Sequence, residues 1–160
     1  MIHYCFDTSA LLDAWTRNYP PDVFPQLWRA IEDGISTEQM FAADEVRVEL
    51  AKKDDALFGW AKKQKSIFVD LDDAQQSAVS EILARFPKLI DTRRGRSGAD
   101  PFVIALAMVR GATVVTGEND DGSADRPKIP TVCAAMGVRW LKPLEFIREN
   151  GWVFSLRTAW

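Results

Sequence analysis

The chain has little of what several enzyme classes need: one histidine, two cysteines and no long apolar run. The single histidine, His3, lies in an apolar segment, which indicates a core residue and disfavours a nuclease with a histidine general base. Cys5 and Cys133 also lie in apolar runs, which indicates two buried thiols in a reducing compartment. A zinc site built from these three residues would lack the usual ligand spacing.

Long apolar stretches are missing as well. No segment approaches the roughly 20 apolar residues of a membrane span. The start of the chain has neither the basic region nor the long apolar run of a signal peptide. We therefore expect a cytoplasmic protein with no membrane partner.

An excess of one charge sign is also absent, because the formal net charge is only −3 at pH 7. This argues against broad electrostatic binding of nucleic acid, but it allows a local basic groove beside an acidic centre. The 160 residues are 47% hydrophobic and 27% charged, which is the balance of a globular chain. We expect one domain over residues 1–150 and an apolar tail over residues 151–160, docked on the domain or on a partner.

Short apolar segments alternate with segments of helical periodicity along the chain. We expect strands at residues 2–6, 66–70, 112–116 and 138–141, with residues 35–41 either a strand or a linker. We expect helices at residues 10–15, 22–34, 44–53, 55–65, 73–86, 100–110, 129–136 and 143–150, the second of them capped by Asp22 and ended by Gly34. This alternation favours a three-layer α/β/α sandwich with a mostly parallel central sheet.

Four acidic residues border these apolar segments. Asp7 and Glu118 each follow an expected strand. Asp100 begins an apolar helix, and Glu49 lies on the inward side of another helix. Because ligands bind beyond the carboxyl ends of parallel strands, we expect the four side chains to converge at that edge of the sheet. Converging carboxylates raise one another's pKa, and a hard cation such as Mg²⁺ relieves the repulsion.

Each acid also has a purely structural explanation. Asp7 and Asp100 stand where helix N-caps are expected, Glu49 could be an exposed helix residue and Glu118 could be a loop residue. Other acids compete for the same roles, namely Asp13, Asp44, Glu45, Asp120 and Asp121. Asp44 is expected to cap its helix, whereas Asp120 or Asp121 could replace or assist Glu118.

Basic residues form clusters that could bind a phosphate backbone. The clusters are Lys52 with Lys53, then Lys62, Lys63 and Lys65, and finally Arg93, Arg94 and Arg96. The lysines also fit a solvated helix face. The arginines lie in a glycine-containing loop just before Asp100, where they could hold a phosphate backbone close to a metal ion.

The segments around the four acids resemble those of PIN-domain ribonucleases. The matching segments are Tyr4–Leu11, Val46–Leu50, Gly98–Ala105 and Val114–Asn119. Within that family the chain resembles the toxins of VapBC-type toxin–antitoxin operons, and more closely an uncharacterised PIN-like branch. In that branch a motif like Lys128–Cys133 follows the last acid.

The resemblance implies a Rossmann-like fold that gathers carboxylates around Mg²⁺ or Mn²⁺ and cleaves RNA. By motif position, the residues that bind metal and act in catalysis are Asp7, Glu49, Asp100 and Glu118. The residues expected to contact the substrate are Thr8, Ser9, Arg93, Arg94, Arg96 and Thr116. Relatives often carry Asp where this chain has Glu118, so Glu118 or Asp120 is expected as an outer ligand. Such toxins usually dimerise and are inhibited by a small antitoxin that fills the active-site groove.

The sequence therefore predicts a metal-dependent endoribonuclease that uses an activated water and no protein nucleophile. Two alternatives remain open. A Mg²⁺-dependent phosphatase with an aspartate nucleophile would need a second aspartate two residues after Asp7, where this chain has Ser9. A catalytically inactive PIN-like module could bind RNA or protein, although the presence of all four acids argues against it.

Overall fold

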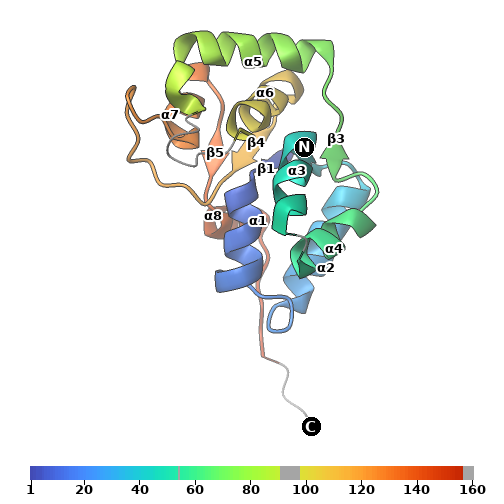
Figure 1. The fold of residues 1–160 in the computed structure, drawn as a ribbon. Helices are drawn as coiled ribbons and strands as arrows, with labels where there is room; N and C mark the ends of the chain where they lie inside the picture. Colours follow the sequence, from blue (N-terminus) through green and yellow to red (C-terminus); the bar gives the residue numbers. More distant parts are fainter. Residues whose placement is uncertain (54, 91–97, 157–160) are drawn as a thin grey trace.

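The computed structural model describes residues 1–53, 55–90 and 98–156. The strands in this part of the chain form a five-stranded sheet in the order β3-β2-β1-β4-β5, and all neighbouring strands are parallel. The strands are β1 (Tyr4–Phe6), β2 (Met40–Ala43), β3 (Phe68–Val69), β4 (Thr113–Val115) and β5 (Trp140–Leu141). The parallel sheet that the alternating pattern predicts is confirmed (Figure 1).

Helices separate the strands along the chain. They are α1 (Thr8–Leu12), the π-helix η1 (Asp13–Asn18), α2 (Pro25–Ser36), α3 (Asp44–Lys53), α4 (Ala56–Lys63), α5 (Asp73–Arg85), the 3₁₀ helix η2 (Pro87–Leu89), α6 (Asp100–Arg110), α7 (Ile129–Met136) and α8 (Pro143–Glu149). No helix in the described residues is long and apolar enough to cross a membrane.

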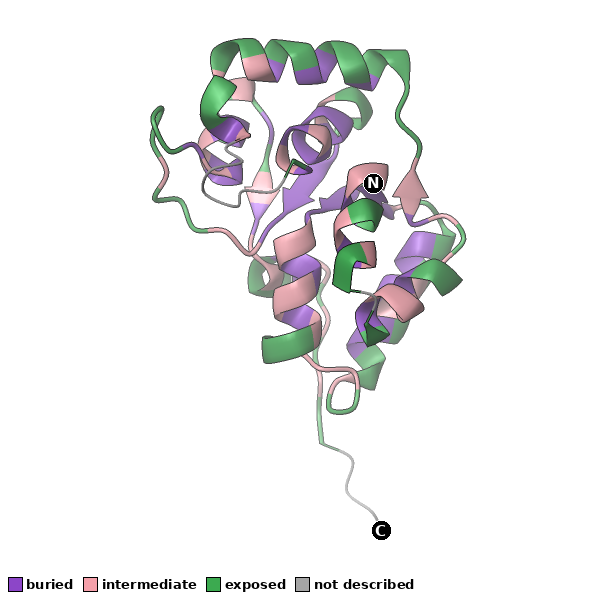
Figure 2. Cartoon of the chain, in the orientation of Figure 1, coloured by how far each residue is buried: buried purple, intermediate pink, exposed green. Residues whose placement is uncertain are grey.

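The side chains of β1 alternate between two covered faces of the sheet. Cys5 points to α6, where its thiol donates to the carbonyl of Val103 at 3.6 Å. Tyr4 and Phe6 point to α8, with ring centroids 4.8 and 5.2 Å from that of Phe146. The central strands β1, β2 and β4 therefore lie buried between helices, whereas β3 and β5 at the edges of the sheet are partly exposed (Figure 2). The predicted three-layer sandwich is confirmed.

The first helical segment is longer and less regular than expected. It begins at Thr8 because Asp7 caps it, and after Leu12 it continues as the π-helix η1. The amide of Tyr19 donates to the carbonyl of Ala14 at 2.8 Å, an i→i−5 bond that defines the wider helix. The expected bounds of 10–15 are therefore wrong at both ends.

The predicted bounds of the second helix are also wrong. α2 begins at Pro25, so Asp22 does not cap it, and it passes through Gly34 to Ser36. Gly34 is needed for packing, because a Cβ atom there would lie 2.4 Å from Sδ of Met40 on β2. A tight connection then follows with Glu38 at φ 61°, so residues 35–41 combine a helix end, a turn and the start of β2.

The tail after α8 packs on the domain through alternate side chains. The ring of Trp152 lies 5.4 Å from that of Phe146, and Phe154 lies 6.1 Å from Phe24. Val153 and Leu156 are 89% and 97% exposed, so the contact is one-sided. Residues 157–160 lie outside the described part.

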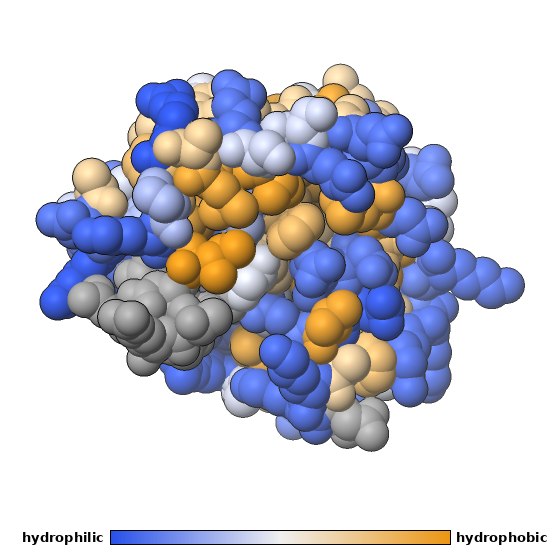
Figure 3. Space-filling view, turned by 45° about the horizontal axis from the view of Figure 1, so that its top comes forward, coloured by the Kyte–Doolittle hydropathy of each residue, from blue (hydrophilic) through white to orange (hydrophobic). Residues whose placement is uncertain are grey.

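The outer surface is mixed in polarity. With the α5 end brought forward, hydrophilic side chains cover the rim, and hydrophobic side chains gather toward the centre and upper part of the view (Figure 3). Exposed apolar residues on the helices include Val48 on α3 and Val109 on α6.

Candidate active site

Asp7 is the buried carboxylate at the carboxyl edge of the sheet. It directly follows β1, is 2% exposed, and caps α1 through a 2.7 Å bond from the amide of Ala10 to Oδ1. The hydroxyl of Thr116, just after β4, donates to Oδ2 at 2.7 Å. The hydroxyl of Ser9 lies 2.9 Å from both carboxylate oxygens. The capping role that the sequence offered for Asp7 is confirmed, and its role as a metal ligand stays a prediction.

Burial raises the pKa of Asp7 to about 7. The hydrogen bonds from Thr116, Ala10 and Ser9 oppose this effect, and the charge of Glu118 adds to it. From the sequence, we expected repulsion between carboxylates to raise the pKa. The main physical cause of the raised pKa of Asp7 is instead its removal from water.

Glu49 is connected to this centre through Thr8. The hydroxyl of Thr8, the first residue of α1, donates to Oε1 of Glu49 on α3 at 2.6 Å. Helix α3 contacts both α1 and α6, and the bond to Thr8 places Glu49 on the side of α3 that faces α1. The hydroxyls of Thr8, Ser9 and Thr116 thus hold acids, and their predicted contact with substrate stays a prediction.

Glu118 has a structural role that the sequence did not indicate. Its Oε2 accepts a hydrogen bond from the amide of Ile129 at 2.7 Å, at the first position of α7. Its own amide donates to the hydroxyl of Thr116 at 3.0 Å. Glu118 therefore joins the end of β4 to the start of α7.

Asp100 is the first residue of α6 and not its N-cap, which is Ala99. Capping therefore does not explain the acid at this position. Burial raises the pKa of the Cys133 thiol, and the charges of Asp7, Glu118 and Asp100 raise it further. Three of the four acids thus lie within electrostatic range of one buried thiol, although they come from distant parts of the sequence.

The competing acids separate into different environments. Asp44 binds Arg47 within α3, and this hydrogen bond holds the pKa of Asp44 below its usual range. Asp121 pairs with Lys128 at 2.6 Å, which lowers the pKa of that carboxyl in the same way. Both are accounted for by local ion pairs on the surface.

Asp13 is closer to the centre than the sequence indicated. A Cβ atom at Gly117 would lie 2.2 Å from Oδ2 of Asp13 and 3.2 Å from the carbonyl of Ser9. Asp13 therefore packs on the backbone between Thr116 and Glu118. The glycine directly before the last acid is the signal that could have revealed this close approach.

The acids predicted to bind a divalent cation supply carboxylate oxygens. Within residues 1–53, 55–90 and 98–156, no three His, Cys, Asp or Glu side chains stand close enough together to form a ready metal site. Glu49 and Glu118 each use one carboxylate oxygen in the hydrogen bonds described above. Carboxylate oxygens are ligands that suit Mg²⁺. The chemistry of the donors fits the ion, and its binding stays a prediction.

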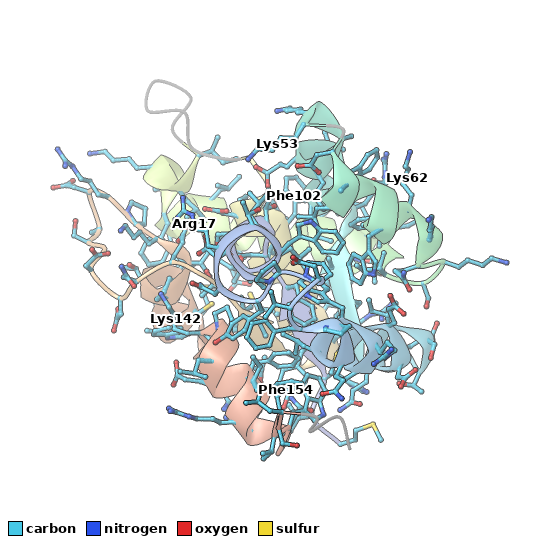
Figure 4. All side chains as sticks on the ribbon, turned by 90° about the horizontal axis from the view of Figure 1, so that it is seen from below. Arg17, Lys53, Lys62, Phe102, Lys142 and Phe154 are labelled. Atoms are coloured by element: carbon cyan, nitrogen blue, oxygen red, sulfur yellow. The ribbon has the colours of Figure 1, made fainter. Side chains whose placement is uncertain are left out.

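Several basic side chains lie on the side of the molecule from which α1 is seen end-on. Figure 4 shows Arg17 and Lys142 on one side of α1, with Lys53 and Lys62 on other sides and Phe102 near the centre. The predicted contacts Arg93, Arg94 and Arg96 lie outside the described residues.

Comparisons with known proteins place the chain in a family. Residues 4–154 match the family described as a domain of unknown function, DUF4411. The chain belongs to this family. No curated protein matches the sequence.

The DUF4411 chain is similar to solved structures at low identity. VapBC2 from Rickettsia felis, crystallised with a DNA fragment from its promoter, matches with a TM-score of 0.52 and 14% identity, over 89% of this chain and 98% of that one. PAE2754 from Pyrobaculum aerophilum matches with a TM-score of 0.48 and 17% identity, over 94% and 96% of the two chains. The VapBC2 match confirms the PIN-domain fold of this DUF4411 member.

Proposed function

We propose that this DUF4411 chain is a Mg²⁺- or Mn²⁺-dependent endoribonuclease and the toxin of a toxin–antitoxin pair. The observation that carries the proposal is the buried Asp7, held by three donors at the carboxyl edge and within electrostatic range of Glu118. A desolvated carboxylate costs free energy unless a counter-charge or hydrogen bonds offset the cost, and such groups are frequent at functional sites. Structural capping alone needs no such burial.

The side chains around Asp7 have distinct parts in this proposal. Thr116 and Ser9 fix the orientation of the Asp7 carboxylate, and Thr8 does the same for Glu49. Asp7, Glu49 and Asp100 would hold the cation, with Glu118 or Asp120 as the outer ligand. When bound there, a divalent cation supplies an activated water for attack on the phosphodiester and stabilises charge on the leaving oxygen.

The proposed partners are RNA, a small antitoxin and a second copy of the chain. The fold likeness to VapBC2 supports a toxin–antitoxin setting, and the basic residues around α1 in Figure 4 support a polyanionic substrate. We place the protein in the cytoplasm, where such a substrate is found. A small reading frame that overlaps the start of this gene would support the assignment as a toxin.

The test is cleavage of defined single-stranded RNA during titration with Mn²⁺ or Mg²⁺. We expect activity that depends on the cation and falls at least 100-fold in Asp7→Asn, because this change removes a charged ligand and keeps the shape of the side chain. Glu49→Gln, Asp100→Asn and Glu118→Gln should also lower activity, Glu118→Gln the least. Asp73→Asn, an exposed acid on α5, is the matched control and should cleave normally. Full activity of Asp7→Asn would contradict the proposal.

The alternatives give different results in the same assay. A phosphatase would release phosphate from small monoesters, but Ser9 stands at the position of its acid and donates to Asp7 instead. An inactive module would bind RNA without cleaving it, so neither the wild type nor any of the four acid variants would cleave RNA when the cation is added.

A further inference from the structure

A small cleft begins one residue away from the acidic centre. It has a volume of about 260 Å³ and lies between η1 and the start of α8, lined by Asp13, Asn18, Tyr19, Gly117, Lys142 and Pro143. We call it the η1 cleft. Gly117 stands between Thr116 and Glu118, so a group in the η1 cleft would lie directly beside the proposed cleavage site.

The walls of the η1 cleft are fixed by specific contacts. Nζ of Lys142 donates to the carbonyl of Gly117 at 2.8 Å and to Oδ1 of Asn119 at 2.7 Å. Asp13 packs against Gly117 so closely that no larger residue fits at position 117 without movement. Asp13 and Lys142 therefore face the same small space from opposite elements, a π-helix and a helix start. π-Helical segments are frequent at functional sites.

The polar groups in the η1 cleft match one nucleobase. The Asp13 carboxylate offers two acceptors, and the Lys142 ammonium has three donors, of which two are used within the protein. The Watson–Crick edge of guanine presents one acceptor, O6, followed by two donors, N1–H and the 2-amino group. The other three bases fit less well, because each puts an acceptor where the Asp13 carboxylate needs a donor. In adenine and cytosine this acceptor is a ring nitrogen, and in uracil it is a carbonyl oxygen. Tyr19 and Pro143 supply apolar surface for the flat ring.

We propose that the η1 cleft binds an unpaired guanine of the substrate, with Asp13 on N1–H and the 2-amino group and Lys142 on O6. The role in RNA selection rests on the proposed nuclease function, whereas binding of the base does not. Arg17 is 78% exposed and its guanidinium lies 3.8 Å from Asp13, so it can contact the phosphate of the same nucleotide. Figure 4 shows Arg17 on the same side of α1 as Lys142.

The test is titration of the whole protein with the four nucleoside 5′-monophosphates, followed by amide NMR shifts. We expect guanosine monophosphate to shift the amides of Asn18, Gly117 and Asn119 and to bind about tenfold more tightly than the other three. Inosine monophosphate lacks the 2-amino group and should bind about tenfold more weakly than guanosine monophosphate. This comparison changes the ligand and leaves the protein intact.

Protein variants provide the second arm. Asp13→Asn should lose the preference for guanine, whereas Asp73→Asn should keep it. Equal affinity for guanosine and inosine monophosphates, shifts confined to other surfaces, or no shift at millimolar nucleotide would each overturn the proposal. Binding of guanosine monophosphate by a protein that cleaves no RNA would support the cleft and refute the nuclease. Cleavage of RNA without nucleotide binding in the cleft would do the reverse.

Discussion

Asp7 has the most unfavourable environment for a charge among the acids of the proposed site. It is 2% exposed, and its pKa is raised to about 7. Between about pH 4 and pH 7 the carboxyl group therefore takes up a proton when the chain folds. Three donors hold it in place, two of them within three residues along the chain and one just after β4. The orientation of the carboxylate thus depends on both local capping and sheet assembly.

The first prediction at this scale concerns pH. Because the pKa of Asp7 is higher in the folded state than its ordinary value, the free energy of unfolding should fall as pH rises from about 4 to about 7, by at most about 4 kcal/mol. Asp7→Asn should lack this slope. Urea unfolding followed by tryptophan fluorescence measures it. Mg²⁺ at pH 8 should restore stability to the wild type and less to the variant. Parallel pH profiles of the free energy of unfolding in the wild type and in Asp7→Asn would contradict the assignment of this slope to Asp7.

A second residue-scale prediction concerns Thr116. Thr116→Val removes the donor to Asp7 and the acceptor for the Glu118 amide, so it should cost about 1–3 kcal/mol of stability and raise the pKa of Asp7 further. The pH profile of cleavage should move to higher pH. Thr113→Val, at the start of β4, is the control and should leave that profile in place.

At the scale of elements, the alternation of strands and helices was enough to predict the parallel sheet, and local signals predicted several helix ends. Gly111 and Gly137 end α6 and α7 in the left-handed conformation, as the sequence indicated. The prediction that Gly34 ends its helix was wrong, because this glycine is needed for a tertiary contact. The approach of Met40 leaves no room for a side chain, and no local pattern encodes that contact.

Alanine at the two helical glycines, Gly34 and Gly59, should therefore change the stability of the protein in opposite directions. Gly34→Ala places a Cβ atom 2.4 Å from the Met40 sulfur, so it should destabilise the protein by about 1–3 kcal/mol. Gly59→Ala on α4 meets no atom within 4 Å and should stabilise it by about 0.5–1 kcal/mol. Thermal unfolding of the two variants measures both effects, and changes of the same sign would contradict the packing argument.

The candidate site shows the same limit of sequence reasoning. Strand order places Asp7 and Glu118 at one edge, and this much follows from the pattern. The hydrogen bond of Glu118 to the start of α7 and the packing of Asp13 on Gly117 depend on how two loops approach each other. Such contacts arise from the assembled fold, so the sequence could place Asp13 only among the competing acids.

At the scale of the whole molecule, Trp152 and Phe154 of the tail pack on α8 and on Phe24 before α2. Trp152→Ala should cost about 1–3 kcal/mol, because an edge-to-face aromatic pair with Phe146 is lost. Val153→Ala should change stability by less than about 0.5 kcal/mol, since that side chain is 89% exposed. Equal costs in urea unfolding would show that the tail does not pack as described.

The bond between Asp7 and Thr116 spans 109 residues, and β1 reaches its place only when β2 and β4 are both present. During synthesis, Asp7 leaves the ribosome long before Thr116 and β4 exist. A nascent or truncated chain that stops before β4 cannot assemble the acidic centre. The order of translation therefore keeps any hydrolytic activity silent until most of the polypeptide has emerged.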